Sequence, residues 1–148
     1  MCGIFGFLSQ HELPVSSLLD GMKRLEYRGY DSAGIALLRE GEKKFKTIKT
    51  IGSVSSLQEL LPLALGPIRT GLGHTRWATH GQVSEKNAMP LVSQNGSLCL
   101  AMNGILENDC EIRSQLEKKS LKFITENDAE TILEFISNRF GSRLLTVS

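Results

Sequence analysis

The sequence predicts an α+β fold, in which antiparallel strands form sheets and helices pack outside them. Short apolar runs bounded by glycine, asparagine and aspartate indicate the strands. Segments with apolar residues at helical spacing indicate the helices. The 148 residues are enough for one domain with a buried core, and no internal repeat, low-complexity segment or flexible linker divides them.

The first part of the chain predicts a strand, a helix and a hairpin. Residues 2–9 are an apolar run that favours a buried strand. Pro14 then opens a helix, because its fixed φ suits the first turn. The apolar face of this helix consists of Val15, Leu18, Leu19, Met22 and Leu25. Residues 35–39 and 45–50 predict the hairpin, with Gly41 in its turn.

The middle of the chain predicts a short helix and two strands separated by a long loop. Residues 55–61 favour the helix, which the Gly-Pro pair at 66–67 ends. Residues 71–77 and 97–102 favour the strands, and a polar loop runs between them through Gly96. A loop of this length is uncommon in a compact domain and often carries function.

Capping residues predict two further helices. Asn108, with Glu111 three residues later, matches a capping box. Asp128, or its neighbour Asn127, can cap the last helix. The apolar face of that helix consists of Ile132, Leu133, Ile136 and Phe140.

The composition disfavours several classes of partner. The formal net charge is +1 and no dense Lys/Arg block occurs, which argues against nucleic acid. No apolar stretch approaches the ~20 residues that cross a bilayer, and no signal-peptide pattern opens the chain, so we expect a cytoplasmic protein without a membrane partner. An odd set of cysteines favours a reducing compartment: Cys2, Cys99 and Cys110. Four lysines predict the solvated face of an edge strand: Lys43, Lys44, Lys46 and Lys49.

Cys2 has two interpretations. If Met1 is removed, one residue carries both a thiol nucleophile and an α-amine whose pKa, about 7.7–8.0, suits a base at neutral pH. Gly3 would then leave the new terminus open for processing and substrate approach. Alternatively, Cys2 belongs to a buried first strand, since cysteine is among the most buried residue types.

Two later segments are rich in reactive or directional groups: residues 24–34 and residues 74–81. The second holds Arg76, whose planar fork suits a carboxylate, and Trp77, which can wall a small ligand. Gly73 and Gly81 flank it and allow backbone movement. Such a polar segment between glycines is poor core material, so it predicts a binding site.

Five motifs together resemble the class II glutamine amidotransferases, which are N-terminal-nucleophile hydrolases. They are residues 2–6, 27–34, 74–81 and 103–108, and Asp128. The runs 27–34 and 74–81 narrow the resemblance to the glutaminase domain of the glutamine–fructose-6-phosphate transaminases (isomerising), which make glucosamine 6-phosphate. The resemblance covers essentially the whole chain. It implies an αββα sandwich of antiparallel sheets.

The resemblance also implies roles for individual residues. Cys2 matches the nucleophile that forms a γ-glutamyl thioester and releases ammonia, with its own α-amine as base. Asn103 and Gly104 match the oxyanion hole. Arg76 and Asp128 match the partners of the glutamine α-carboxylate and α-ammonium groups. Trp77, Thr79, His80 and Gly81 match the loop that closes over glutamine, and Arg28 matches a residue that orders the site.

Taken alone, these residues have simpler interpretations. Asn103 and Gly104 form a common turn pair, because both tolerate positive φ. Asp128 is a typical helix cap, and Arg76 a typical surface ion-pairing residue. His74 and His80 invite a metal, but their spacing fits no standard zinc motif, so we expect no metal and no cofactor.

The chain departs from the resembled family in two ways. Members usually carry histidine at the position of Met102, and commonly at those of Met89 and Leu91. Their glutaminase domains are also longer, so residues 1–148 are expected to be a glutaminase domain incomplete at its C-terminal end. The resemblance implies further sugar-isomerase domains that bind fructose 6-phosphate, and a homo-oligomeric full-length enzyme. A non-catalytic remnant, or an amidotransferase for purine or asparagine synthesis, remains as the alternative.

Overall fold

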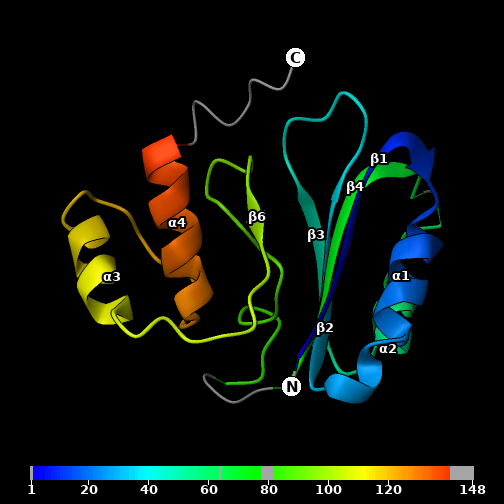
Figure 1. The fold of residues 1–148 in the computed structure, drawn as a ribbon, viewed down its shortest axis with the longest axis horizontal. Coiled ribbons are helices and arrows are strands. Elements are labelled where there is room, and N and C mark those ends of the chain that lie inside the picture. Colours follow the sequence, from blue (N-terminus) through cyan, green and yellow to red (C-terminus); the bar gives the residue numbers. More distant parts are fainter. Residues whose placement is uncertain (1, 64, 78–81, 141–148) are drawn as a thin grey trace.

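The structure is a computed structural model that describes residues 2–63, 65–77 and 82–140. Its layers follow one another as helices, sheet, sheet and helices (Figure 1). Helices α1 (Val15–Lys23) and α2 (Val54–Glu59) cover the outer face of the larger sheet. Helices α3 (Asp109–Glu117) and α4 (Asp128–Phe140) lie beyond the smaller one. The predicted α+β sandwich is confirmed.

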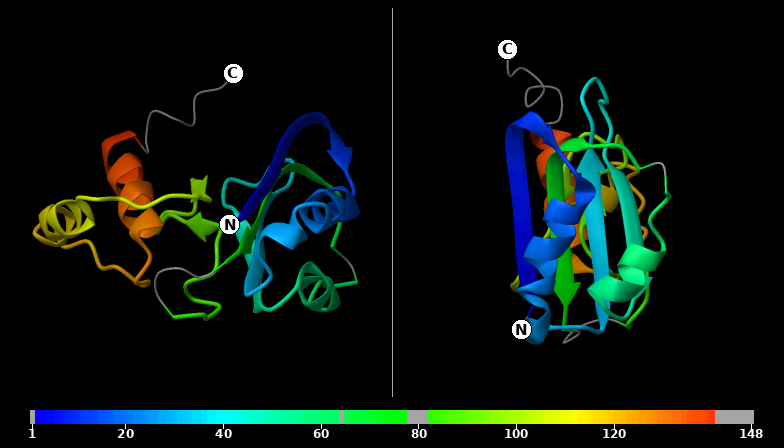
Figure 2. Two further views of the ribbon diagram at one scale, coloured as in Figure 1. Left: turned by 60° about the horizontal axis from the view of Figure 1, so that its bottom comes forward. Right: turned by 90° about the vertical axis from the view of Figure 1, so that its right-hand side faces the viewer.

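The larger sheet has four strands, β1 (Gly3–Leu13), β2 (Ser32–Leu38), β3 (Lys46–Ile51) and β4 (Ile68–Arg76). They lie side by side in the order β1-β4-β2-β3, and every neighbouring pair is antiparallel (Figure 2). The register pairs Gly3 with Thr75 and Ser32 with Arg76. The start of the chain therefore lies beside the C-terminal end of β4.

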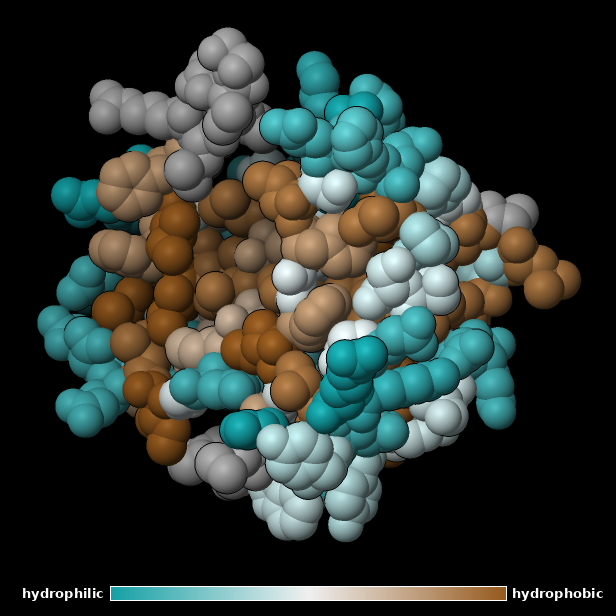
Figure 3. Space-filling view, turned by 45° about the vertical axis from the view of Figure 1, so that its right-hand side comes forward, coloured by the Kyte–Doolittle hydropathy of each residue, from teal (hydrophilic) through white to brown (hydrophobic). Residues whose placement is uncertain are grey.

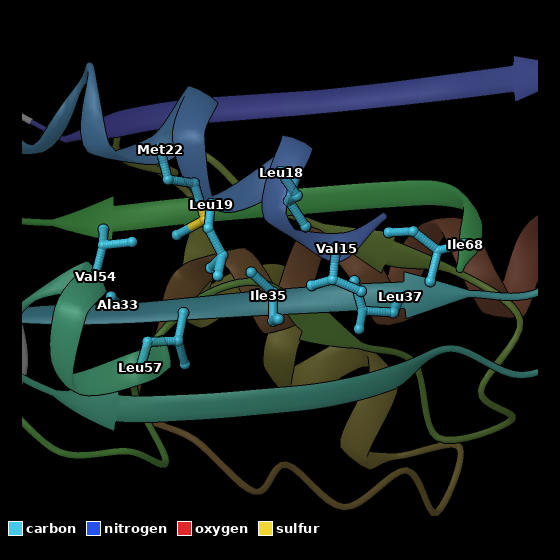
Figure 4. Packing of buried hydrophobic residues seen from close by; sticks show 10 residues of the cluster. All are labelled: Val15, Leu18, Leu19, Met22, Ala33, Ile35, Leu37, Val54, Leu57 and Ile68. Atoms are coloured by element: carbon cyan, nitrogen blue, oxygen red, sulfur yellow. The ribbon is translucent and has the colours of Figure 1, made fainter. Parts of the chain in front are cut away.

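The main core fills the space between this sheet and its two helices (Figure 4). Four residues of the predicted helix face are buried there: Val15, Leu18, Leu19 and Met22. The fifth, Leu25, lies outside α1, which ends at Lys23 and is followed by a short 3-10 helix, η1 (Glu26–Arg28). Small residues bring α1 close to the sheet, since a Cβ at Gly73 would meet the Met22 sulfur at 2.3 Å.

The two edge strands differ from their sequence-based descriptions. The prediction of a buried first strand is wrong for one face of β1, because an edge strand packs fully on one side only: Leu8 is 84% exposed, while Phe5 and Phe7 pack against the core. The lysine-rich strand β3 is an edge strand, as predicted. Lys49 nevertheless is half-buried, and its burial lowers the pKa of the amine to about 8, against the opposing attraction of Glu130.

The smaller sheet pairs β5 (Leu91–Val92) with β6 (Cys99–Leu100). β5 arises inside the segment predicted as a loop, and β6 is shorter than its predicted range. A second buried cluster joins this sheet to α4 and consists of Met89, Leu91, Ala129 and Leu133. Cys99 is half-buried, and burial raises the pKa of its thiol to about 11. Apolar residues form a broad patch in the middle of the face shown in Figure 3, and hydrophilic residues lie along much of its rim.

The helix caps follow the prediction at α4 but not at α3. The Asn127 side chain accepts a hydrogen bond from Ala129 N at 3.0 Å, so Asn127 caps α4 and Asp128 is its first residue. α3 begins after Asn108 as predicted, yet the Asn108 side chain makes no capping bond. Its backbone (φ −103°, ψ 31°) lies outside the extended region that a capping side chain needs.

Candidate functional site

One end of the sandwich gathers the ends of several elements around a cavity of about 270 Å³. Cys2 immediately precedes β1 and Arg76 ends β4, so both come from the larger sheet. Asn103 follows β6 and Asp128 begins α4, so both come from the other half. All four residues line the cavity, together with Trp77 and Gly104. Residues far apart in sequence thus meet at one site, near the end marked N in Figure 1.

The Cys2 thiol is held at the cavity wall by the backbone of Trp77. Trp77 N donates to Cys2 Sγ at 3.3 Å, and Sγ in turn donates to Trp77 O at 3.6 Å. Cys2 is half-buried and borders the cavity, so it is not part of either buried cluster. The interpretation of Cys2 as a core residue is therefore wrong.

Two glycines let the segment after α1 pack against these strand ends. A Cβ at Gly3 would lie 2.7 Å from Leu25 Cβ and 2.7 Å from Thr75 Oγ1. A Cβ at Gly29 would lie 2.7 Å from Trp77 N. All three distances are shorter than real Cβ contacts, so the close packing requires glycine at both positions. Gly3 thus has a packing role besides the openness expected of it.

Asn103 connects the two halves of the site. Its Nδ2 donates to the backbone carbonyl of Cys2 at 3.0 Å, and its Oδ1 lies 3.1 Å from His74 Nε2. Neither Asn103 nor Gly104 has positive φ, so the alternative of a tight turn pair is wrong. A Cβ at Gly104 would meet only Met102 Cγ, at 4.0 Å. The backbone here is open towards the cavity.

His74 is fully buried on β4, two residues before Arg76. Burial lowers the pKa of its imidazole to about 4; the hydrogen bond with Asn103 opposes this and the charge of Arg76 adds to it. The ring is therefore neutral at pH 7. From the sequence, His74 is only a member of the motif 74–81 and a possible metal ligand, with no role of its own in the site. The period of two along a strand, which puts residues 74 and 76 on one face, could have indicated its proximity to the site.

Asp128 ties the loop after Asn103 to the start of α4. Its Oδ2 accepts a hydrogen bond from Leu106 N at 2.6 Å. Arg113 of α3 fixes the segment just before Asp128, since it donates to the backbone carbonyls of Thr125 and Asn127 at 3.1 Å and 3.3 Å. The carboxylate is thus placed by a network of main-chain contacts.

The charges at the cavity are divided. Arg76 brings a cation from β4, and three carboxylates come from the segments of α3 and α4: Asp109, Glu126 and Asp128. A ligand with an anionic and a cationic end would suit this division. Cavity-lining residues that the sequence analysis did not assign to the site are Met89, Met102, Ile105, Leu106, Asp109, Glu126 and Asn127. Ile105 and Leu106 belong to the motif 103–108, but nothing local predicts that Asp109 and Glu126 line the cavity, because they reach it only through the packing of the second half.

Some predicted site residues are not gathered with the others. Arg28 is not among the residues that line the cavity; its Nε donates to the Tyr27 hydroxyl at 3.1 Å. Thr79, His80 and Gly81 lie outside the described residues. Within the described ranges, no group of three or more histidine, cysteine and acidic side chains is arranged to hold a metal ion. None of the described helices is long and apolar enough to cross a membrane.

Comparison with known sequences identifies relatives of this chain. The glutamine amidotransferase domain family matches residues 66–147. A glutamine–fructose-6-phosphate aminotransferase (isomerizing) of Symbiobacterium thermophilum is 44% identical over 98% of this chain and 23% of its own length. The corresponding protein of Aquifex aeolicus is 40% identical over 98% of this chain and 24% of its length. The chain spans about a quarter of the length of these curated relatives.

Two solved structures share the fold of this chain. The glutamine phosphoribosylpyrophosphate amidotransferase of B. subtilis superposes with a TM-score of 0.73 and 30% identity, covering 89% of this chain and 28% of that one. The allosteric regulatory enzyme of purine biosynthesis superposes with a TM-score of 0.76 and 27% identity, covering 100% of this chain and 30% of that one. These matches agree with the sandwich seen here.

Proposed function

This chain belongs to the glutamine amidotransferase family, and we propose that it hydrolyses the side-chain amide of L-glutamine through a thioester on Cys2. The observation that carries the proposal is the meeting of the Cys2 thiol with Asn103 and Gly104 at one cavity. A thiol nucleophile beside two donors for a developing oxyanion is the minimum that acyl transfer requires. Residues 1–148 are proposed to belong to one glutaminase domain.

The proposed reaction has two steps. Cys2 Sγ attacks the side-chain carbonyl of glutamine, the carbon–sulfur bond forms, and the carbon–nitrogen bond breaks to release ammonia. Water then attacks the thioester carbonyl and releases glutamate and the free thiol. The base is the α-amine of Cys2, which takes the thiol proton and passes it to the leaving ammonia. This base exists only after Met1 is removed, so removal of Met1 is a condition of activity.

Asn103 and Gly104 are proposed to stabilise the tetrahedral intermediates. One N–H of the Asn103 amide is used by the Cys2 carbonyl, which leaves the second for the oxyanion. The open side of Gly104 lets its backbone N–H approach the same atom. Donors of this kind contribute about 10²–10³-fold to kcat each.

Arg76 and Asp128 are proposed to select glutamine by its charged ends. The guanidinium of Arg76 suits the α-carboxylate as a two-pronged donor, and the carboxylate of Asp128 suits the α-ammonium group. Trp77, half-exposed at the cavity, is proposed to cover the bound substrate with Thr79, His80 and Gly81. Arg28 is proposed as a supporting residue, acting through the segment around Tyr27.

The proposed acceptor of the ammonia is fructose 6-phosphate, which would become glucosamine 6-phosphate in a cytoplasmic, homo-oligomeric enzyme. The support is the name and the 40–44% identity of the matched aminotransferases over nearly the whole chain. The isomerase part would lie in the further length of the protein. A purine-type acceptor is the second candidate, supported by the two solved structures, but their identity of 27–30% is lower.

The test is glutamate release from glutamine by the full-length protein, with intact mass used to verify loss of Met1. Cys2→Ala should lower kcat by at least about 10³-fold, because no other group can form the thioester. Cys110→Ser is the matched control and should retain activity, since Cys110 is exposed on α3 and does not line the cavity. Undiminished activity of Cys2→Ala would refute the thioester. Supplying fructose 6-phosphate or phosphoribosyl pyrophosphate as acceptor then distinguishes the two candidates.

A further inference from the structure

The contact between His74 and Asn103 joins the interior of the larger sheet to the proposed oxyanion hole. His74 is 0% exposed and lies on the central strand β4, paired with Ile4 of β1 and Gly34 of β2. Asn103 lies on an exposed loop and has no strand neighbours of its own. The 3.1 Å contact between His74 Nε2 and Asn103 Oδ1 therefore holds a loop residue against a rigid element.

The chemistry of the two groups defines where the proton lies. An amide oxygen can only accept, so Nε2 must carry the hydrogen and donate it to Oδ1. His74 Nδ1 has no hydrogen-bond partner among the described residues, which agrees with an unprotonated Nδ1. The neutral Nε2–H tautomer gives Nε2 its acceptor and leaves no buried N–H of the ring unpaired. The cation Arg76, which also faces this region, disfavours a second proton on the ring.

This donor decides which end of the Asn103 amide faces the cavity. With Oδ1 bound to His74, Nδ2 is left to donate to the Cys2 carbonyl and to the substrate. The flipped amide would place its oxygen against the Cys2 carbonyl and towards the developing oxyanion. Like partial charges would then meet where the reaction needs a donor.

We propose that His74 is a positioning residue, whose Nε2–H fixes the amide of Asn103 with its N–H groups towards the nucleophile and the reacting carbonyl. The inference deepens the proposed function and rests on it. His74 does not touch the substrate in this role. It acts only through Asn103, so removing it should weaken transition-state stabilisation without weakening glutamine binding.

The experiment measures glutamine hydrolysis by the full-length protein with four variants: His74→Leu, His74→Gln, Asn103→Ala and the double variant His74→Leu/Asn103→Ala. His74→Leu should lower kcat by about 10–100-fold, less than the about 10²–10³-fold expected when a donor is removed outright, with KM changed less than about threefold. His74→Gln retains an N–H donor and should recover most of kcat. In the Asn103→Ala background, His74→Leu should have no further effect.

A buried histidine with a purely structural role would behave differently. Its loss would lower the amount of folded enzyme, add to the effect of Asn103→Ala, and not be rescued selectively by a donor. Unchanged kcat in His74→Leu, or additive effects in the double variant, overturns the inference. If wild-type protein turns glutamine over in these cases, the proposed function stands and only the inference fails.

A measurement on unmutated protein keeps the inference testable if His74→Leu does not fold. The ¹⁵N shifts of labelled histidine should show His74 as the neutral Nε2–H tautomer at pH 7. An Nδ1–H tautomer overturns the inference, since its unprotonated Nε2 could not donate to the amide oxygen of Asn103. Absence of glutamine turnover by wild-type protein lacking Met1 would instead contradict the proposed function, whatever the tautomer.

Discussion

The larger sheet and the smaller sheet contribute to the cavity in different ways. Cys2, His74 and Arg76 come from the ends of regular strands, above a cluster of ten buried apolar residues among those described. Asn103, Gly104 and Asp128 come from a loop and a helix start, beside a cluster of four. Strand register places the first group, whereas hydrogen bonds of the loop and of the start of α4 place Asn103 and Asp128. The nucleophile is thus supported by packing, and its electrostatic partners by polar contacts.

The largest expected difference between the halves is in stability. Leu18→Ala removes a fully buried side chain from the larger cluster and should cost about 2–5 kcal/mol of the free energy of opening. The cost of Leu133→Ala in the smaller cluster should lie near the lower end of this range, because partly exposed neighbours can close over the cavity that it leaves. Hydrogen exchange of the β2 and β4 amides measures both. An equal or larger cost for Leu133→Ala would contradict the comparison.

For catalysis, we expect substitutions in the half that contains the smaller sheet to have a large effect. Asn103→Ala should lower kcat for glutamine hydrolysis by about 10²–10³-fold, because an oxyanion donor is lost. The protein should also lose about 1–3 kcal/mol of stability, because the Nε2–H of the fully buried His74 is left without its acceptor. Asn138→Ala, exposed on α4 and away from the cavity, is the matched control and should change neither. A loss of stability without loss of kcat in Asn103→Ala would make its role structural.

The buried histidine should make the larger half sensitive to acid. The pKa of His74 is about 4 in the folded protein and 6.5 ordinarily, so the unfolded state binds more protons as pH falls through this interval. Stability should therefore fall between pH 6.5 and pH 4, by about 3 kcal/mol in total. Unfolding measured across this range for wild type and His74→Gln isolates the contribution. Parallel curves for the two proteins would show that His74 does not titrate in this way.

The smallest expected effect concerns the helix start that presents Asp128. Asn127→Ala removes the capping bond to Ala129 N and should cost about 1 kcal/mol. It should also raise the KM for glutamine, because Asp128 is the next residue. Asn108→Ala at the start of α3 is the matched control, since that side chain makes no capping bond. A similar fall in the melting temperature of both variants would contradict the finding that only Asn127 makes a capping bond.

Local patterns in the sequence predicted much of the fold. The helix face from Val15 to Met22 and the antiparallel strands follow from apolar periodicity, which acts within one element. The exposed face of β1 and the half-buried Lys49 could not be predicted in this way. Both depend on which strands are at an edge and on what the opposite layer provides, and those contacts are distant in sequence.

The candidate site could likewise be predicted from the sequence only in part. The sequence by itself determined the chemical groups of the site, because motif and residue type are local properties. These groups are the thiol of Cys2, the guanidinium of Arg76, the Asn103–Gly104 pair and the carboxylate of Asp128. Only the tertiary structure decided that His74 meets Asn103 and that Asn127 rather than Asp128 caps α4. Which donor meets which acceptor depends on the register of β4 and on the path of the loop after β6. Those are set by packing between the two halves.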